Sequence, residues 1–154
     1  MNLTQLHKIR QVAMDGNWPE MENFFNSSLQ LKQMNIRIDL SNPKTPTVYI
    51  DQVQEMHRGG IGTDAVNGAV IAMLADLAIS LLGFAHYAEG MTATSSLTIH
   101  YVKPLLAQKV IVKAEQTEVI GKRVFGVAKV MNEKEEVCSY ANGSLAKGDR
   151  KSVV

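Results

Sequence analysis

Residues 64–84 read DAVNGAVIAMLADLAISLLGF, and one side chain in this stretch differs from all of its neighbours. Between Ala65 and Phe84 the only ionisable residue is Asp76, which stands among Ala, Val, Ile, Leu and Met. An isolated carboxylate is costly to keep charged in apolar surroundings. A sequence that keeps one there has either a partner for it or a use for it.

The apolar run predicts a long helix that is buried inside a domain. It covers residues 68–84, which is short of the roughly 20 residues of a membrane-spanning helix, and it lacks flanking positive clusters. A helix that is apolar on all sides can instead be buried by the rest of a folded domain. We therefore expect no membrane partner, and a helix that ends between Gly83 and Gly90.

The segments on either side of this helix predict further helices and strands. Before it we expect short helices and strands at residues 3–14, 19–25, 29–40 and 47–53, the last two being strands. After it we expect three or four strands, at about residues 92–102, 109–119, 122–132 and 136–146. Short joints between consecutive strands favour an antiparallel sheet, which has to wrap around the central helix. The fold class is therefore α+β, and too little other helix remains to cover the helix completely, so we expect an oligomer.

Composition bounds the class of protein and its partners. The chain has 154 residues and a formal net charge of +1, which favours one domain and argues against a nucleic-acid partner. Its single cysteine, Cys138, excludes an intrachain disulfide and fits a reducing compartment, so we expect a cytoplasmic protein. The first residues, MNLTQLHKIRQVAMDG, are too polar for the apolar core of a secretory signal.

Two motifs resemble the hotdog-fold acyl-CoA thioesterases of the phenylacetate-pathway (PaaI-like) group. The first is NGAVIAMLAD at residues 67–76, where that family has His-Gly-Gly, a few apolar residues and then Leu-Ala-Asp. The second is TSSLTIHYVKP at residues 94–104, where the family has a strand that begins with Thr or Ser and ends in an aromatic residue and x-x-Pro. The resemblance implies a hotdog fold over residues 28–146, an antiparallel sheet around one long central helix. Residues 1–27 would then be a helical segment packed on this domain, and residues 147–154 a polar tail.

The resemblance also implies an activity, the hydrolysis of an acyl-CoA thioester without a cofactor or a metal. In the family, the helix Asp attacks the thioester or activates the water that does, and this sequence leaves both routes open for Asp76. Burial raises the pKa and the basicity of a carboxylate, which suits either role. Thr94 matches the Ser/Thr position that starts the later strand, where it could orient the attacking water.

The start of the helix supplies the second catalytic element. The first amides of a helix lack an intrahelical acceptor and lie at the positive end of its dipole. Family resemblance assigns the oxyanion donor to the N–H of Gly68, which is free only if Asn67, rather than Asp64, caps the helix. Gly68 and Asp76 are about 12 Å apart along one helix. In hotdog dimers two such helices lie antiparallel, so that Gly68 of one subunit would face Asp76 of the other, in a dimer or a dimer of dimers.

Departures from the family pattern concern the residues around the substrate. Asn67 replaces the family His, Ala69 replaces the second Gly, and the loop MHRGGIGTDAV is about two residues longer than usual. We expect His57 and Gly60 of this loop, together with Ala69 and Met73 of the helix, to contact the substrate. His57 could also bind a metal, but no second His or carboxylate stands at ligand spacing from it. Lys103, Lys122 and Arg123 are basic side chains that could meet the phosphates of coenzyme A or simply face solvent.

Each of these residues also has a structural interpretation. Asp76 could be a buried carboxylate satisfied by neighbours, and Gly68 could serve only close helix packing. A hotdog protein that binds acyl-CoA without hydrolysing it is the main alternative function, and the missing His is its best support. A hotdog dehydratase is disfavoured, because the helix has no Glu and Asn67 is not a His. A purely structural oligomer would have no affinity for acyl-CoA.

Overall fold

The computed structural model describes residues 3–59, 62–87 and 92–147 of the chain. Its helices are α1 Leu3–Met14, α2 Trp18–Asn26, α3 Leu29–Gln33, a 3-10 turn η1 Glu55–His57, and α4 Gly68–His86. Its strands are β1 Arg37–Asp39, β2 Thr47–Ile50, β3 Thr92–Tyr101, β4 Val110–Ile120, β5 Arg123–Met131 and β6 Val137–Lys147. The long helix and the four strands after it agree with the sequence prediction to within one or two residues at nearly every boundary.

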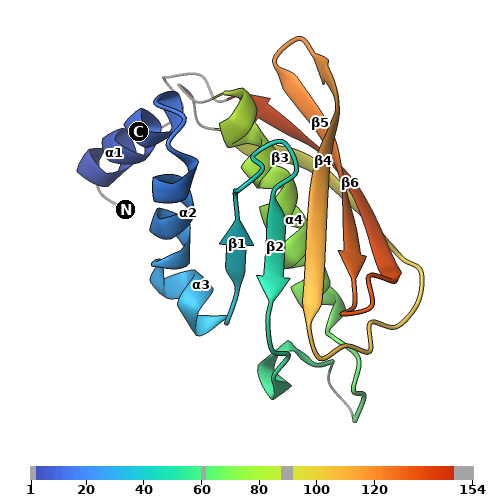
Figure 1. Ribbon diagram of the computed structural model, residues 1–154. Helices are drawn as coiled ribbons and strands as arrows, with labels where there is room; N and C mark the ends of the chain where they lie inside the picture. The colour runs from blue at the N-terminus through green and yellow to red at the C-terminus, as the bar shows by residue number, and fades with distance from the viewer. Residues whose placement is uncertain (1–2, 60–61, 88–91, 148–154) are drawn as a thin grey trace.

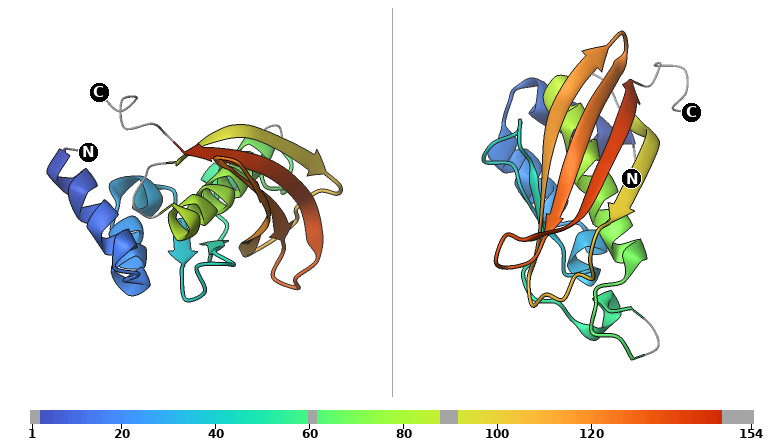
Figure 2. Two further views of the ribbon diagram at one scale, coloured as in Figure 1. Left: turned by 90° about the horizontal axis from the view of Figure 1, so that it is seen from above. Right: turned by 90° about the vertical axis from the view of Figure 1, so that its right-hand side faces the viewer.

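One antiparallel sheet curves around α4 (Figures 1 and 2). Its strand order is β1-β2-β4-β5-β6-β3, so β3, which follows the helix directly, crosses to the far edge and pairs with β6 rather than with β4. The other edge is β1, and α2 packs beside it. This is the hotdog fold, in which the sheet wraps a single central helix.

The apolar run of α4 folds as it does because the sheet covers one side of it. Leu74, Ala75, Ala78 and Ile79 have no exposed surface and pack in the core that the sheet strands line. Burying an aliphatic side chain of the size of Leu74 or Ile79 stabilises a fold by about 1.5–3 kcal/mol. The opposite side of the helix, which includes Asp76, is only half-buried in the single chain.

Within the described residues, α4 is the one helix long and apolar enough to cross a membrane by length and composition. It lies instead against the sheet, in contact with β2, β3, β4, β5 and β6, and the sheet curves around it (Figure 2).

The predicted strand at residues 29–40 is wrong in its first half. Leu29–Gln33 is the helix α3, and only Arg37–Asp39 is extended. The reason is local, because the hydroxyl of Ser28 accepts the N–H of Leu31 and caps a run of good helix formers. The apolar alternation from Met34 onward is real, but it extends over only three paired residues. The second predicted strand, at residues 47–53, likewise ends at Ile50.

Candidate functional site

Asp76 lies in a row of three hydrogen-bonded side chains. The hydroxyl of Thr94 donates to Oδ1 of Asp76 at 2.7 Å, and the hydroxyl of Ser80 lies 3.3 Å from the same Thr94 oxygen. Thr94 has a single proton, which is committed to the carboxylate, so Ser80 is the donor in the second bond. The carboxylate of Asp76 therefore has a fixed neighbour on one oxygen, while its other oxygen has no partner within the described chain.

A break in the strand pattern brings Thr94 to the helix. Side chains along a strand alternate between the two faces of the sheet, and Leu97 and Ile99 of β3 pack towards the core that contains α4. Regular alternation would turn Thr94 to the opposite face. The register of β3 against β6 shifts between Thr94 and Ser96, and this β-bulge turns Thr94 towards the helix as well.

Gly83 lets the same strand approach the helix closely. A Cβ built at position 83 would collide with the side chain of Thr92, at the start of β3. Any larger residue would therefore push the strand away from α4, and with it Thr94 from Asp76. Gly83 is a packing requirement of the site rather than a chemical participant in it.

The carboxylate of Asp76 faces a small, mostly apolar pocket between α4 and the α3–β1 segment. The cavity has a volume of about 200 Å³, below the range of pockets for drug-sized ligands. It is lined by Gln30, Leu31, Met34, Ile36, Met73, Asp76, Leu77 and Ser80. No lining residue carries a positive charge, so this pocket suits an uncharged, apolar group beside the carboxylate.

At the other end of the site, α4 begins at Gly68, and Asn67 is its N-cap, as the sequence predicts. The side-chain oxygen of Asn67 accepts the N–H of Ala69 at 2.8 Å, and its backbone carbonyl accepts that of Ile71. Within the described residues the N–H of Gly68 has no acceptor, as expected for the first helical position. This amide is therefore available to a ligand.

The Gly68 amide borders a groove of about 340 Å³ that also includes Tyr101, Lys103, Pro104 and Leu105. The hydroxyl of Tyr101 donates to the carbonyl of Gly68 at 2.9 Å, and its ring lies 3.4 Å from where a Cβ of residue 68 would be. Tyr101 thus holds the first peptide of the helix from outside. Lys103 contributes a half-exposed ammonium group, 3.7 Å from Glu136.

The two halves of the predicted site do not share a cavity within one chain. Asp76 and Gly68 line different pockets, one at the α3 side of the helix and one at its N-terminus. Eight residues of helix separate them, or about 12 Å. A single reacting carbonyl therefore cannot contact both within this chain.

The expectation that His57 contacts the substrate needs correction. The imidazole has no exposed surface. Its Nδ1 accepts the N–H of Gln54 at 2.9 Å, and its Nε2 lies 2.8 Å from the carbonyl oxygen of Met34. With both nitrogens bonded to backbone and no exposed surface, the ring has nothing to offer a substrate or a metal. His57 belongs to the framework of the loop before the helix.

Of the other residues expected to contact the substrate, Met73 is the one that lines the Asp76 pocket. Ala69 is exposed at the helix start and lies in the lining of neither pocket. Gly60 lies outside the described residues. Among the described residues no group of three His, Cys, Asp or Glu could hold a metal ion.

Sequence reasoning missed Ser80 and the contact of Tyr101 with Gly68. Ser80 is the only hydroxyl residue in the run from residue 65 to residue 84, and it lies one helical turn after Asp76. Residues four apart share a helix face, so this spacing was a usable signal. The contact of Tyr101 depends on how β3 ends beside the helix, which no local pattern reveals.

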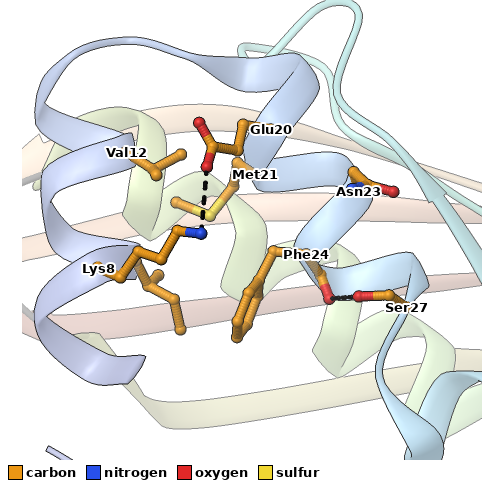
Figure 3. A pocket seen from close by; sticks show the side chains of 8 residues that line it. Lys8, Val12, Glu20, Met21, Asn23, Phe24 and Ser27 are labelled. Carbon is orange, nitrogen blue, oxygen red and sulfur yellow. Dashed lines mark hydrogen bonds and ion pairs between the residues drawn. The ribbon is translucent and has the colours of Figure 1, made fainter. Parts of the chain in front are cut away.

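A further hollow, of about 190 Å³, lies between α1 and α2 (Figure 3). Lys8 and Glu20 form an ion pair of 3.6 Å across it, and the side chains of Met21 and Phe24 form part of its wall. None of the predicted site residues lines it, so it is not part of the arrangement around Asp76.

Comparison with known proteins gives one family match. Residues 64–139, which contain α4 and most of the sheet, match the family described as the thioesterase superfamily. The sequence has no significant match among curated proteins.

Solved structures share the fold over almost the whole chain at low sequence identity. A Shewanella oneidensis protein related to the thioesterase superfamily superposes with a TM-score of 0.75 at 16% identity, covering 96% of this chain and 100% of that one. A Haemophilus influenzae thioesterase gives 0.74 at 18% identity, with 84% and 90% of the two chains covered. The E. coli PaaI protein from the phenylacetic acid degradation operon gives 0.70 at 15% identity, with 92% and 96% covered.

Proposed function

We propose that the chain, whose residues 64–139 match the thioesterase superfamily and which has the hotdog fold, is a PaaI-like member of that family and a homo-oligomeric hydrolase of acyl-CoA thioesters. The observation that carries the proposal is the Asp76 carboxylate, bonded to Thr94 in a small apolar pocket, on the same helix as the free amide of Gly68. A base or nucleophile and an oxyanion donor are the two elements that acyl transfer requires.

In the proposed reaction an oxygen atom bonds to the thioester carbonyl carbon, and the C–S bond then breaks, so that coenzyme A leaves as a thiolate and takes up a proton of the water that is consumed. That oxygen belongs either to Asp76, which forms an anhydride that water later opens, or to a water molecule whose proton Asp76 removes. Both routes require Asp76 in its ionised form. The Gly68 N–H stabilises the negative charge that develops on the carbonyl oxygen, a contribution of roughly 3–4 kcal/mol.

We propose a positioning role for Thr94 in place of the water-orienting role that the sequence suggests. Its proton is already donated to Asp76, and one of its two lone pairs accepts from Ser80. This leaves Thr94 no proton for water, but it holds one carboxylate oxygen in place, so the other is presented to the pocket. Ser80 orients the Thr94 hydroxyl in turn.

The two pockets suggest how the substrate would be divided. The Asp76 pocket, apolar and without a cation, suits an uncharged acyl group. The Gly68 groove, with Lys103 at its side, suits the thiol half, whose phosphates are anionic. The half-buried face of α4 would be covered by a second copy of the chain, which brings the Gly68 of one subunit to the Asp76 of the other. A reducing, cytoplasmic location is part of this proposal.

An assay of thiol release over a panel of CoA thioesters tests the proposal. We expect hydrolysis of short aliphatic or aromatic acyl-CoAs, weak hydrolysis of succinyl-CoA because its carboxylate would lie beside Asp76, and loss of activity in Asp76→Asn. Absence of hydrolysis across the panel would reject the activity.

The alternative is a hotdog protein that binds acyl-CoA without cleaving it. Asn67, in place of the family His, is the observation that favours it. Tight binding of acyl-CoA in calorimetry, with no release of free thiol over hours, would select this function.

A further inference from the structure

His57 is a buried titratable residue that the proposed reaction does not use. It ends the η1 turn and has no exposed surface. A backbone carbonyl can only accept, so the 2.8 Å contact with the Met34 oxygen requires a proton on Nε2. Nδ1 then carries the lone pair that accepts the N–H of Gln54 at 2.9 Å. The ring is thus a neutral imidazole with one donor and one acceptor, both satisfied.

The Nε2 bond fixes one wall of the Asp76 pocket. Met34 and Ile36 line that pocket, and the turn between them has Asn35 at a positive φ of 49°. The N–H of Ile36 bonds back to the carbonyl of Leu31, which closes the end of α3. The Met34 carbonyl takes no part in closing this turn. It accepts a hydrogen bond from Nε2 of His57 instead.

The backbone of the same residue fixes the start of the central helix. The carbonyl of His57 accepts the N–H of Asn67 at 2.8 Å, immediately before Gly68. The next residues continue this pairing, because Arg58 bridges Val66 and the N–H of Gly59 donates to Ala65 at 2.7 Å. The position of the Gly68 amide therefore depends on where residue 57 is held.

We infer that His57 is a positioning residue for both catalytic elements of its own chain, which in the proposed dimer serve two different sites, because one buried imidazole ties the wall of the Asp76 pocket to the loop that sets the Gly68 amide. An apolar residue of similar size would leave the Met34 carbonyl and the Gln54 N–H buried without partners, which is unfavourable. The inference rests on the proposed thioesterase function, but the tie itself can be measured without any turnover.

Two conservative variants separate the two ring nitrogens. Gln places an amide near the position of Nε2, so His57→Gln can still donate to the Met34 carbonyl. Asn places its amide near Nδ1, so His57→Asn keeps the bond to Gln54 and loses the one to Met34. Asn35→Gly is the matched control, since it removes an exposed side-chain bond from the same turn to the Gln52 carbonyl and keeps the positive φ.

The readouts are kcat/KM with the acyl-CoA that the wild-type protein hydrolyses best, and the hydrogen-exchange rates of the Ile36 and Asn67 amides. We expect His57→Asn to lower kcat/KM about 10- to 100-fold, because small displacements of reacting groups have effects of this size. We also expect it to accelerate exchange at Ile36. His57→Gln and Asn35→Gly should stay within about threefold of wild type at temperatures where all are folded.

Each failure has a separate meaning. If His57→Asn folds and its kcat/KM and Ile36 exchange rate equal those of the wild type, the inference is overturned. If the wild-type protein hydrolyses no thioester, the proposed function is overturned, and the exchange rates still test the inference. If His57→Asn does not fold, the imidazole ¹⁵N resonances of the wild-type protein decide. A non-hydrolysable thioether analogue of the substrate should shift the Nε2 resonance, because its acceptor lines the pocket; an unchanged resonance would overturn the inference.

Discussion

The hydroxyl of Thr94 donates a 2.7 Å hydrogen bond to Oδ1 of Asp76, and so joins the edge strand β3 to the central helix α4. The two residues are 18 positions apart in the sequence, and the bond forms only because a β-bulge turns Thr94 inward and Gly83 lets the strand approach. It gives the single carboxylate of the apolar helix a defined orientation towards its pocket.

Asp76→Asn should lower kcat for thiol release by about 10²- to 10⁴-fold, the usual contribution of a catalytic base. The amide keeps the size of the side chain and can still accept from Thr94, so the melting temperature should change by only a few degrees. Asp15→Asn, at an exposed carboxylate beyond the end of α1, is the control and should behave as wild type. Full activity in Asp76→Asn would exclude Asp76 from the chemistry.

The variants Thr94→Val and Thr94→Ser distinguish the contribution of the Thr94 hydroxyl group from that of its methyl group. A hydrogen bond to a charged group contributes about 1.5–3 kcal/mol, so Thr94→Val should lower kcat about 10- to 100-fold. Thr94→Ser keeps the donor to Asp76 and should lose far less. Steady-state kinetics of both variants provide the measurement. Equal losses in the two would point to packing of the methyl group instead.

The sequence predicted the parts of this site that depend on local pattern. The apolar run from Gly68, the cap at Asn67 and the isolation of Asp76 can all be seen in one short stretch, because helix periodicity and capping act within a few residues. The bulge that turns Thr94 inward could not be predicted. A register shift depends on how β3 pairs with β6, some 50 residues later in the chain. A strand pattern without the bulge places Thr94 on the wrong face.

For His57 the sequence pattern predicts a role that the structure does not support. A histidine beside a Gly-rich loop, ahead of a helix that resembles a catalytic one, is typical of a pocket residue, and the sequence pattern therefore predicts a substrate contact for it. Its actual partners, the backbone of Met34 and Gln54, offer no side-chain signal. Backbone groups that need a donor or an acceptor cannot be identified until the fold is known.

Gly68→Pro should remove the oxyanion donor without disturbing the helix. Position 68 is the first residue of α4, where proline is favoured, and Asn67 before it has ψ 136°, which proline prefers in its predecessor. We expect kcat to fall about 10²- to 10³-fold with little change in stability. Gly68→Ala keeps the N–H and is the control. If Gly68→Pro folds and retains kcat, the amide of residue 68 is not the oxyanion donor.

A pH effect on stability should come from the exposed pair Arg37–Asp51. The guanidinium donates two hydrogen bonds to the carboxylate, at 2.7 and 3.0 Å, and these bonds hold the pKa of Asp51 below its ordinary value. Because the pKa of Asp51 is lower in the folded than in the unfolded protein, its ionised form stabilises the fold at pH values above the unfolded pKa of about 3.9. This stability is lost as the pH falls through the folded pKa. The side chains are roughly half exposed, so the effect is modest and weakened by salt.

Comparison of wild type with Asp51→Asn over a pH series isolates this contribution, since most other titrating groups cancel in the difference. The wild-type protein should melt slightly higher at pH 7, and the two melting temperatures should converge once the pH lies below the lowered folded-state pKa of Asp51, where Asp51 is protonated in both states. A difference that stays constant down to that pH would mean that the ion pair contributes nothing through charge.

The arrangement of the site across two subunits can be tested by mixing two inactive variants. In a dimer of one Asp76→Asn chain and one Gly68→Pro chain, one site receives both defects, and the other combines the intact Gly68 of the first chain with the intact Asp76 of the second. After subunit exchange in an equal mixture, half of the dimers are mixed, and each has one of its two sites intact. Activity should therefore recover to about a quarter of wild type. Recovery should also disappear when each variant is assayed alone at the same total concentration. If Gly68 and Asp76 acted within one chain, every chain in the mixture would carry a defect in its own site, and no mixing ratio would restore thiol release.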